Sequence, residues 1–236
     1  MADLSQLKLF MTQAHPCSYL PDEQSTTVFV DPNADMDAQT YAALSDFGFR
    51  RSGSHLYRPR CANCSACIPL RIPVAYFSPT RAQKRCLKRN RDLHCSVVTA
   101  IDTDEHYALY QRYIEQRHAD GDMFPPSRQQ YKDFLSSEWG VTDFLEFRDN
   151  RQNLVAVAVS DRLNSALSAI YSFFDPNLEQ RSLGRFAILY QIQRALHLKL
   201  DYVYLGYWIK NCQKMNYKTE YRPFQMLINS QWISVA

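Results

Sequence analysis

Hydrophobic and polar positions in the second half of the chain follow first the period of strands and then that of a helix. Three segments with strand character come in succession, and the turns at Asp149-Asn150 and Asn164 predict that they form an antiparallel meander. These segments are residues 142–148, 154–161 and 165–174. Apolar residues then line one side of a predicted helix over 182–200, and a short apolar strand follows at 202–205.

The remaining pattern adds elements on both sides of residue 100. A first helix is predicted to end at Gly48, and another begins at Ser78-Pro79-Thr80, where a capping residue precedes the first turn. The other predicted elements are strands at 26–30, 54–58, 70–76, 95–101 and 225–235, and helices at 37–47, 103–118 and 127–137. Cysteine, proline and clustered arginine concentrate before residue 100. We therefore predict an α+β (mixed α/β) fold, with a Cys-rich N-terminal domain over 1–100 and a second domain over 101–236.

The composition is typical of a folded cytoplasmic protein. Of the 236 residues, 46% are hydrophobic, which is enough for a sizeable core. No apolar run approaches the ~20 residues that cross a bilayer, and the first residues lack the basic and apolar regions of a signal peptide. We therefore expect a reducing compartment and no membrane partner, and the seven cysteines would serve metals or catalysis rather than disulfides.

Three cysteines at even spacing, Cys61, Cys64 and Cys67, form the most specific motif. Thiolates so close in one loop predict a soft metal site, and Cys17, or a histidine, would supply a fourth ligand. The histidine candidates are His15 and His55. Zinc and an iron–sulfur cluster both stay open, although the ferredoxin spacing fails because Arg71 stands where its fourth cysteine would be. The scattered cysteines are interpreted as small buried hydrophobes; they are Cys86, Cys95 and Cys212.

A basic helix follows the cysteine loop. The net charge of +3 is too mild to predict nucleic-acid binding, but six cations fall within eleven residues without an acid among them. They are Arg81, Lys84, Arg85, Lys88, Arg89 and Arg91. Like charges on one helix face repel, and a polyanion would relieve that repulsion. We interpret this helix as a contact for a nucleic-acid phosphate backbone; the alternative is an ordinary solvated helix face.

The start of the long helix resembles an anion-binding loop. Arg181 and Gly184 partly match the loop with which GNAT-type acetyltransferases hold the coenzyme A pyrophosphate at a helix N-terminus. Phe186 stands where a small residue is required, so no coenzyme A is expected. The alternative is an ordinary helix start.

An aromatic and amide-rich segment over 202–218 supplies candidate substrate contacts. Tyr207, after Gly206, is predicted to begin a polar loop that could stack a base and bind an aminoacyl ester. The loop candidates are Tyr207, Asn211, Lys214, Asn216 and Tyr217. The alternative is a well-packed sheet edge. No Ser-His-Asp arrangement or Gly-rich nucleotide loop is present. Asp175 and Glu220, which lie beside the aromatic segments, are the candidate bases.

These strings resemble the arginyl-tRNA–protein transferases, over nearly the whole chain and in order. The matching segments are 15–21, 49–53, 57–71, 77–85, 89–90, 171–176, 182–184, 204–209 and 215–218. The compact size is similar to the bacterial branch of the family. The resemblance implies a GNAT-like second domain and the transfer of leucine from leucyl-tRNA to the N-terminal Asp or Glu of acceptor proteins, which marks them for N-degron (N-end rule) degradation. It also implies zinc or an iron–sulfur cluster, although Leu20 stands where eukaryotic members have a cysteine.

The acceptor's acidic side chain requires a cation, and the arginine fork fits a carboxylate. The candidates in the matching strings are Arg50, Arg51, Arg58 and Arg71, together with Tyr171, Gly184 and Tyr204 as further substrate contacts. A surface salt bridge is the alternative for each arginine. Two other functions compete with aminoacyl transfer: a coenzyme A-dependent N-acyltransferase of GNAT type, and a non-catalytic, metal-containing RNA-binding module.

Overall fold

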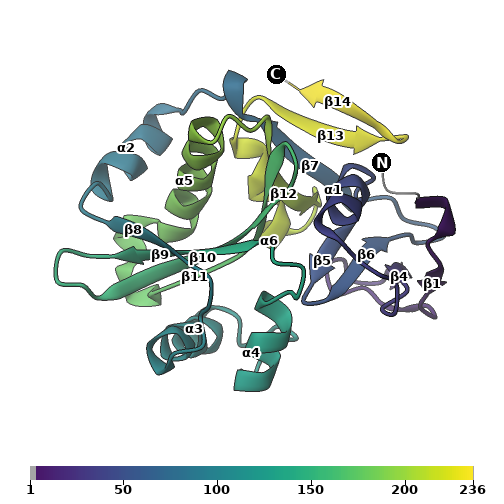
Figure 1. Cartoon of the computed structure of the whole chain (residues 1–236), viewed down its shortest axis with the longest axis horizontal. Coiled ribbons are helices and arrows are strands. Elements are labelled where there is room, and N and C mark those ends of the chain that lie inside the picture. The colour runs from purple at the N-terminus through teal and green to yellow at the C-terminus, as the bar shows by residue number, and fades with distance from the viewer. Residues whose placement is uncertain (1–3, 236) are drawn as a thin grey trace.

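The structure is a computed structural model that describes residues 4–235 (Figure 1). A large sheet of eight strands has the order β14-β13-β7-β12-β11-β10-β9-β8, and a small sheet has the order β1-β4-β6-β5. The large sheet contains β7 (Ile68–Pro73), β8 (His94–Val98), β9 (Thr142–Arg148), β10 (Leu154–Arg162), β11 (Ala166–Phe174), β12 (Tyr202–Trp208), β13 (Phe224–Ile228) and β14 (Gln231–Val235). The small sheet contains β1 (Leu9–Met11), β4 (Thr27–Val30), β5 (Arg50–Ser52) and β6 (His55–Pro59), and a separate pair is formed by β2 (His15–Pro16) and β3 (Gln24–Ser25).

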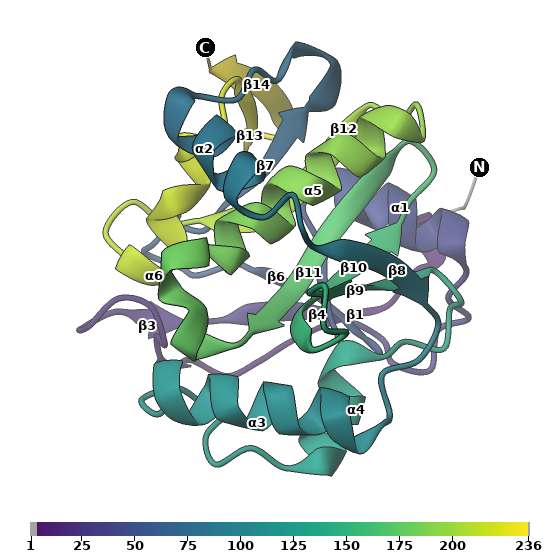
Figure 2. The same cartoon turned by 90° about the vertical axis from the view of Figure 1, so that its left-hand side faces the viewer.

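Helices cover both faces of the large sheet (Figures 1 and 2). The α-helices are α1 (Ala38–Asp46), α2 (Arg81–Arg89), α3 (Asp104–Arg117), α4 (Arg128–Leu135), α5 (Leu183–His197) and α6 (Gln213–Asn216), and the short 3₁₀ turns are η1 (Leu4–Gln6), η2 (Val74–Tyr76), η3 (Pro176–Arg181) and η4 (Tyr217–Glu220). Helices α5 and α2 pack on one face of the sheet, and α3 and α4 pack on the other, so the sheet separates two apolar cores. No helix within 4–235 combines the length and apolar character needed to cross a membrane.

The predicted antiparallel meander is confirmed, because β9, β10 and β11 pair in that manner. Strand β10 is buried over nearly its whole length, as its continuous apolar sequence requires in the centre of a sheet. The single strand predicted at 225–235 is wrong. Asn229 and Ser230 both adopt positive φ, and this two-residue turn divides the segment into the hairpin of β13 and β14.

Helix α5 connects β11 to β12, and these two strands run parallel. They pair only from Ala166 opposite Tyr202 to Ser168 opposite Tyr204, so their ladder ends well before β11 does. Strand β12 instead pairs with β7 along its other edge. The mixed α/β fold, with a strand meander followed by a helix after the Gly184 loop, is confirmed.

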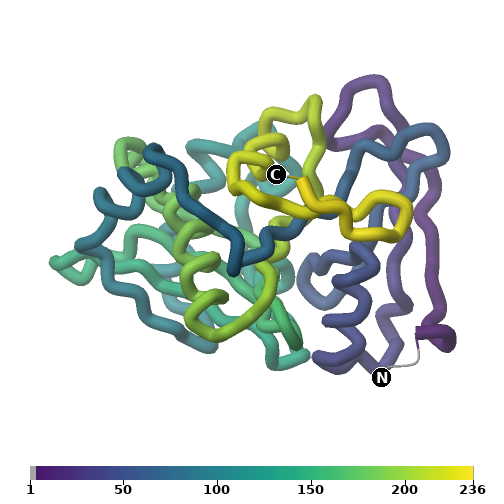
Figure 3. The backbone as a smooth tube through the Cα atoms, turned by 90° about the horizontal axis from the view of Figure 1, so that it is seen from above, coloured from purple at the N-terminus to yellow at the C-terminus, as the bar shows by residue number. Residues whose placement is uncertain are grey.

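The large sheet takes strands from both sides of residue 100. Strands β7 and β8 precede that residue, and both pair with strands that follow it. The small sheet and α1 lie beside the large sheet at one end of the long axis, and α2 lies at the other end (Figures 1 and 3). The division into domains at residue 100 stays a prediction.

A buried ion pair joins the small sheet to the large one. Arg51 on β5 and Asp161 on β10 have side chains with 0% exposure, and Arg51 Nη2 donates to Asp161 Oδ1 at 2.8 Å. Tyr41 on α1 donates its hydroxyl to Asp161 Oδ2 at 2.8 Å, and Thr142 on β9 also binds this carboxylate. Each carboxylate oxygen therefore has hydrogen-bond donors, which a buried charge requires.

Candidate functional site

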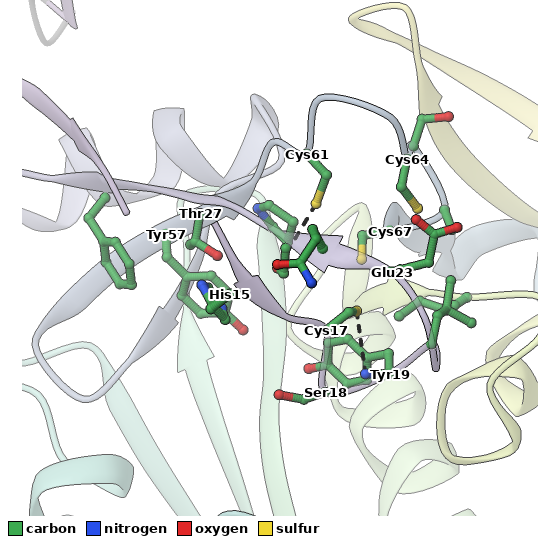
Figure 4. Close-up of a pocket in the computed structure, with 18 of the residues that line it drawn as sticks. His15, Cys17, Ser18, Tyr19, Glu23, Thr27, Tyr57, Cys61, Cys64 and Cys67 are labelled. Atoms are coloured by element: carbon green, nitrogen blue, oxygen red, sulfur yellow. Dashed lines mark hydrogen bonds between the residues drawn. The ribbon is translucent and has the colours of Figure 1, made fainter. Parts of the chain in front are cut away.

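The four cysteines that the sequence predicts as metal ligands line one cavity of about 520 Å³. We call it the cysteine cavity. Cys17 comes from the β2–β3 connection, whereas Cys61, Cys64 and Cys67 come from the loop between β6 and β7. Figure 4 shows their sulfur atoms directed toward the same space, with Tyr19 and Tyr57 nearby. The two histidines proposed as alternative ligands, His15 and His55, line the cavity as well.

The donor chemistry of the cysteine cavity suits a soft metal. All four thiols are free. Burial, with smaller contributions from the neighbouring Cys17, Cys61 and Cys64, raises the pKa of Cys67 to about 12. The described arrangement is nevertheless not a preformed metal site, because no three His, Cys, Asp or Glu side chains within 4–235 are placed to hold one ion. The cysteines outside the motif are buried or half-buried, as expected; they are Cys86, Cys95 and Cys212.

Three of the four candidate arginines are occupied by other groups. Arg51 is held by Asp161. Arg58 Nη1 donates to the carbonyl of Phe47 at 2.7 Å. Arg71 binds Gln225, Tyr204 and Asp46, and its guanidinium lies 3.6 Å from the ring centre of Tyr202 and 4.2 Å from that of Trp232. These contacts fix Arg58 and Arg71 within the fold.

Arg50 differs from the other three. Its Nη1 donates to the carbonyl oxygens of Ser45 and Phe49 at 3.2 and 2.7 Å, and its guanidinium lies 4.7 Å from the centre of the Tyr204 ring. Its Nε and Nη2 are buried and have no hydrogen-bond partner among the described residues. Of the four candidates, Arg50 is therefore the one whose unused donors are buried.

The predicted aromatic loop is partly wrong, because β12 continues through Gly206 to Trp208. Tyr207 therefore lies in the strand, buried, and donates its hydroxyl to the carbonyl of Gly48 at 2.8 Å. Tyr204 is buried too, and its hydroxyl binds Asp46. Tyr207 and Tyr204 thus pack the fold, while the other loop candidates lie at or near the surface; these are Asn211, Lys214, Asn216 and Tyr217.

A second group of polar aromatic residues surrounds Tyr171 on β11. The rings of Tyr113 and Phe134 pack edge-on against the Tyr171 ring, and the Tyr171 hydroxyl is buried without a partner among residues 4–235. Nearby, His118 Nε2 lies 3.1 Å from the Tyr113 hydroxyl. Burial lowers the pKa of His118, and the charge of Lys214 lowers it further, which favours a neutral imidazole.

The loop after His118 links this group to the cysteine cavity. Lys214 on α6 pairs with Asp120 at 2.7 Å. Ser18, which lines the cavity, donates to Asp122 at 3.4 Å. The tyrosine group and the cavity are therefore neighbours, although the sequence places them about a hundred residues apart.

The two candidate bases lie at different elements. Asp175 begins η3, and its Oδ1 accepts the backbone N–H of Asn177 at 2.9 Å. Glu220 is half-exposed and pairs with Arg185 on α5 at 2.8 Å. No contact tests either role, so both stay predictions.

The start of α5 is packed closely rather than open. A Cβ on Gly184 would lie 3.0 Å from the ring of Phe174, so a larger residue would have to displace that ring. The Phe186 ring is buried against Phe147, with ring centres 5.2 Å apart. Arg181 pairs with Asp92 at 2.8 Å.

Helix α2 presents its cations to solvent. Thr80 and Gln83 form a capping box at its start, which satisfies free backbone N–H groups. The six predicted phosphate contacts are all exposed; they are Arg81, Lys84, Arg85, Lys88, Arg89 and Arg91. None of them pairs with an acid in the described part of the chain, although Arg89 donates to the carbonyl of Gln180.

Lys218 is a candidate functional residue that the sequence pattern does not indicate. Its side chain is buried, and Nζ donates to the carbonyl of Tyr207. Burial lowers the pKa of Lys218 to about 7, with the charge of Arg50 as the next cause. Lys218 is the last residue of the matching segment 215–218. The polar sequence around it gives no indication that its side chain is buried.

Comparisons with known proteins identify the family. The family model "Arginine-tRNA-protein transferase, C terminus" matches residues 105–228, and "Arginine-tRNA-protein transferase, N terminus" matches 15–85. A relative from Teredinibacter turnerae, named aspartate/glutamate leucyltransferase, is 60% identical over 100% of this chain and 97% of its own length. One of the same name from Pseudomonas syringae pv. tomato is 60% identical over the whole of both chains.

Similarity to solved structures is more distant. L-PGS from Bacillus licheniformis is 11% identical with a TM-score of 0.47, over 71% of this chain and 49% of that one. A GCN5-related glucosamine N-acetyltransferase region of a fungal multi-domain β-N-acetylglucosaminidase is 12% identical with a TM-score of 0.42, over 73% of this chain and 21% of that one.

The two matched regions and these relatives define a transferase of aminoacyl groups. The chain belongs to the arginine-tRNA-protein transferase family.

Proposed function

We propose that the protein transfers leucine from leucyl-tRNA to the N-terminal Asp or Glu of acceptor proteins. The observation that carries this proposal is identity of 57–60% over essentially the full length to relatives named aspartate/glutamate leucyltransferase. The product would begin with leucine and would enter N-degron degradation in the cytoplasm.

The proposed reaction moves one acyl group. The α-amino nitrogen of the acceptor attacks the leucyl carbonyl carbon, a C–N bond forms and the ester C–O bond breaks. The ribose hydroxyl of the tRNA leaves with a proton, and the amine loses one. Because the ester is already activated, the protein must chiefly hold both partners together and accept the proton. Asp175 and Glu220 are the proposed bases.

The donor is proposed to contact two regions. The exposed cations of α2 suit the tRNA backbone, because phosphate contacts of this kind position a nucleic acid. The aminoacyl end would approach the segment around Tyr171, Lys214 and Tyr217, which borders the cysteine cavity through Ser18 and Asp122. No role is proposed for coenzyme A.

We also propose that Cys17, Cys61, Cys64 and Cys67 hold zinc or an iron–sulfur cluster. Four thiols on one cavity support this assignment, and the metal would fix the loop between β6 and β7 to the β2–β3 connection. Elemental analysis of the purified protein should give one zinc, or iron with visible absorption, per chain. The Cys64→Ser variant should lose metal, and a metal-free wild type would overturn the assignment.

A transfer assay tests the proposed function. Purified protein would be mixed with leucyl-tRNA and peptides that begin with Asp, Glu, Asn or Ala. We expect N-terminal leucine on the Asp and Glu peptides only. Acylation from acetyl-coenzyme A would instead favour an N-acyltransferase, and tRNA binding without any transfer would favour a binding module.

A further inference from the structure

Two buried basic side chains lie beside the cysteine cavity without an acidic partner. Arg50 and Lys218 are each 5% exposed. Neither forms an ion pair with an Asp or Glu in the described part of the chain, unlike Arg51, which is also buried and is held by Asp161. Buried charges in proteins are normally paired, because desolvating an unpaired charge costs several kcal/mol (about 3–5 when one partner is removed).

Two of the three nitrogen atoms of the Arg50 guanidinium donate no hydrogen bond to the described residues. Only Nη1 is used, by the carbonyl oxygens of Ser45 and Phe49. Nε and Nη2 lie next to each other on the guanidinium fork and have no partner among the described residues. These two atoms form the edge that grips a carboxylate with two parallel hydrogen bonds.

Lys218 reinforces the same positive region. Its Nζ donates to the carbonyl of Tyr207 and lies 3.3 Å from the sulfur of Met215, so one of its three N–H groups is satisfied by oxygen. The charge of Arg50 acts on Lys218, together with the thiols of Cys67 and Cys212. The two cations are therefore electrostatic neighbours.

The region adjoins the cysteine cavity. Tyr57 lines the cavity and lies within the field of Arg50, and Cys67 lines the cavity and lies within the field of Lys218. Neither Arg50 nor Lys218 lines the cavity itself, so the carboxylate would have to pass its wall to reach their donors. The exposed cations of α2 lie at the opposite end of the long axis (Figures 1 and 3).

We propose that Arg50 and Lys218 bind the side-chain carboxylate of the acceptor's N-terminal Asp or Glu, with Arg50 Nε and Nη2 as the direct donors. This assignment rests on the proposed function. It selects Arg50 from the four candidate arginines because Arg51 is held by Asp161 and Arg71 by Asp46 and Gln225. Arg58, which donates to Phe47, is only half-buried and so has no buried donors that need a ligand. It also gives a reason for the two unpaired buried basic groups, because a bound carboxylate would supply the negative charge that both lack.

The decisive readout is discrimination between Asp and Asn at the peptide N-terminus. These residues differ by one charge and nearly match in size. We expect Arg50→Gln to reduce the ratio of kcat/KM for the Asp peptide over the Asn peptide by about tenfold or more, because a charged hydrogen bond is lost. Lys218→Met should reduce the ratio in the same direction. The ratio does not depend on the fraction of active protein, so partial unfolding of a variant would not imitate the effect.

Two controls accompany these variants. Arg151→Gln removes a positive charge from an exposed turn and should leave the ratio unchanged. Arg50→Lys keeps the charge but loses the fork, and it should retain only part of the discrimination. The affinity of each variant for leucyl-tRNA should equal that of the wild type; a loss there instead would assign the cations to the donor and overturn the proposal.

Direct peptide binding separates this inference from the proposed function. Fluorescence anisotropy of labelled Asp and Asn peptides needs no transfer. If the wild type transfers leucine and Arg50→Gln and Lys218→Met both keep the wild-type ratio, the inference fails and the function stands. If the wild type transfers nothing, the function fails, and tighter binding of the Asp peptide that Arg50→Gln abolishes would still support the site. Equal binding of both peptides by the wild type would overturn it.

Discussion

At the scale of single residues, the buried charges fall into two kinds. Arg51 and Asp161 are fully buried and satisfy each other, with Tyr41 and Thr142 completing the hydrogen bonds of the carboxylate. Arg50, the preceding residue, is also buried and has unused donors. Successive side chains of β5 point to opposite faces of the strand, so Arg50 and Arg51 lie in different surroundings. The paired charges join separate elements, and the unpaired Arg50 has donors available for a ligand.

Replacing Asp161 by Ala should leave Arg51 buried and unpaired. We expect the free energy of unfolding to fall by about 3–5 kcal/mol. Glu179→Gln removes one partner of the exposed Arg117–Glu179 pair, and it should change stability by less than about 1 kcal/mol. Urea denaturation of both variants measures the difference. Similar small losses in the two variants would mean that the buried pair does not join the sheets.

At the scale of elements, the turn between β5 and β6 fits against α4. Gly53 adopts φ +59°, and its N–H donates to the carbonyl of Phe134 at 2.9 Å. A Cβ at this position would lie 2.0 Å from the carbonyl oxygen of Asp133. The turn therefore needs glycine for two reasons, the left-handed backbone and the lack of space.

Gly53→Ala should destabilise the protein more than Gly140→Ala. Gly140 has a similar φ of +65°, but a Cβ added there would have no described atom within 4 Å, so this position isolates the backbone strain. We expect a loss of about 1–2 kcal/mol for Gly140→Ala and about 1–3 kcal/mol more for Gly53→Ala. Thermal and urea unfolding would show this, and equal losses would contradict the close packing of the turn on α4.

Helix α2 carries the exposed cations proposed to contact the tRNA. Its capping box holds the helix start, so the exposed cations can change without loss of the fold. We expect Lys84→Glu with Lys88→Glu to weaken leucyl-tRNA binding and to make it less dependent on salt, because each lost phosphate contact lowers the salt slope by about 0.7–0.9. Arg151→Glu is the matched control. Binding that keeps the wild-type salt slope would assign α2 to an ordinary solvated face.

At the scale of the whole molecule, the sequence predicts elements and local motifs better than it predicts contacts between distant residues. The meander and the cysteine loop follow from local pattern, and the cavity brings Cys17 to that loop as expected. Gly206 resembles a strand end and so predicts a loop at Tyr207, yet pairing with β7 continues β12 past it. Metal binding and the roles of Asp175 and Glu220 stay predictions.

The proposed acceptor site could not be predicted from local pattern. Arg50 and Lys218 are separated by more than half of the chain, and each has the local pattern of a surface cation in a polar segment. Only the folded arrangement shows that they are buried, that Asp161 is used by Arg51, and that Arg50 has free donors. Which charges remain unpaired is a property of tertiary packing.

Transfer of leucine from tRNA to an acidic N-terminus is the central property proposed for this chain. The most direct measurement is the initial rate of transfer to one Asp-peptide from leucyl-tRNA and, in parallel, from arginyl-tRNA. We predict N-terminal leucine on the peptide and little or no arginine. Transfer of arginine with no transfer of leucine would contradict the donor, and no transfer from either, with metal restored, would contradict the function itself.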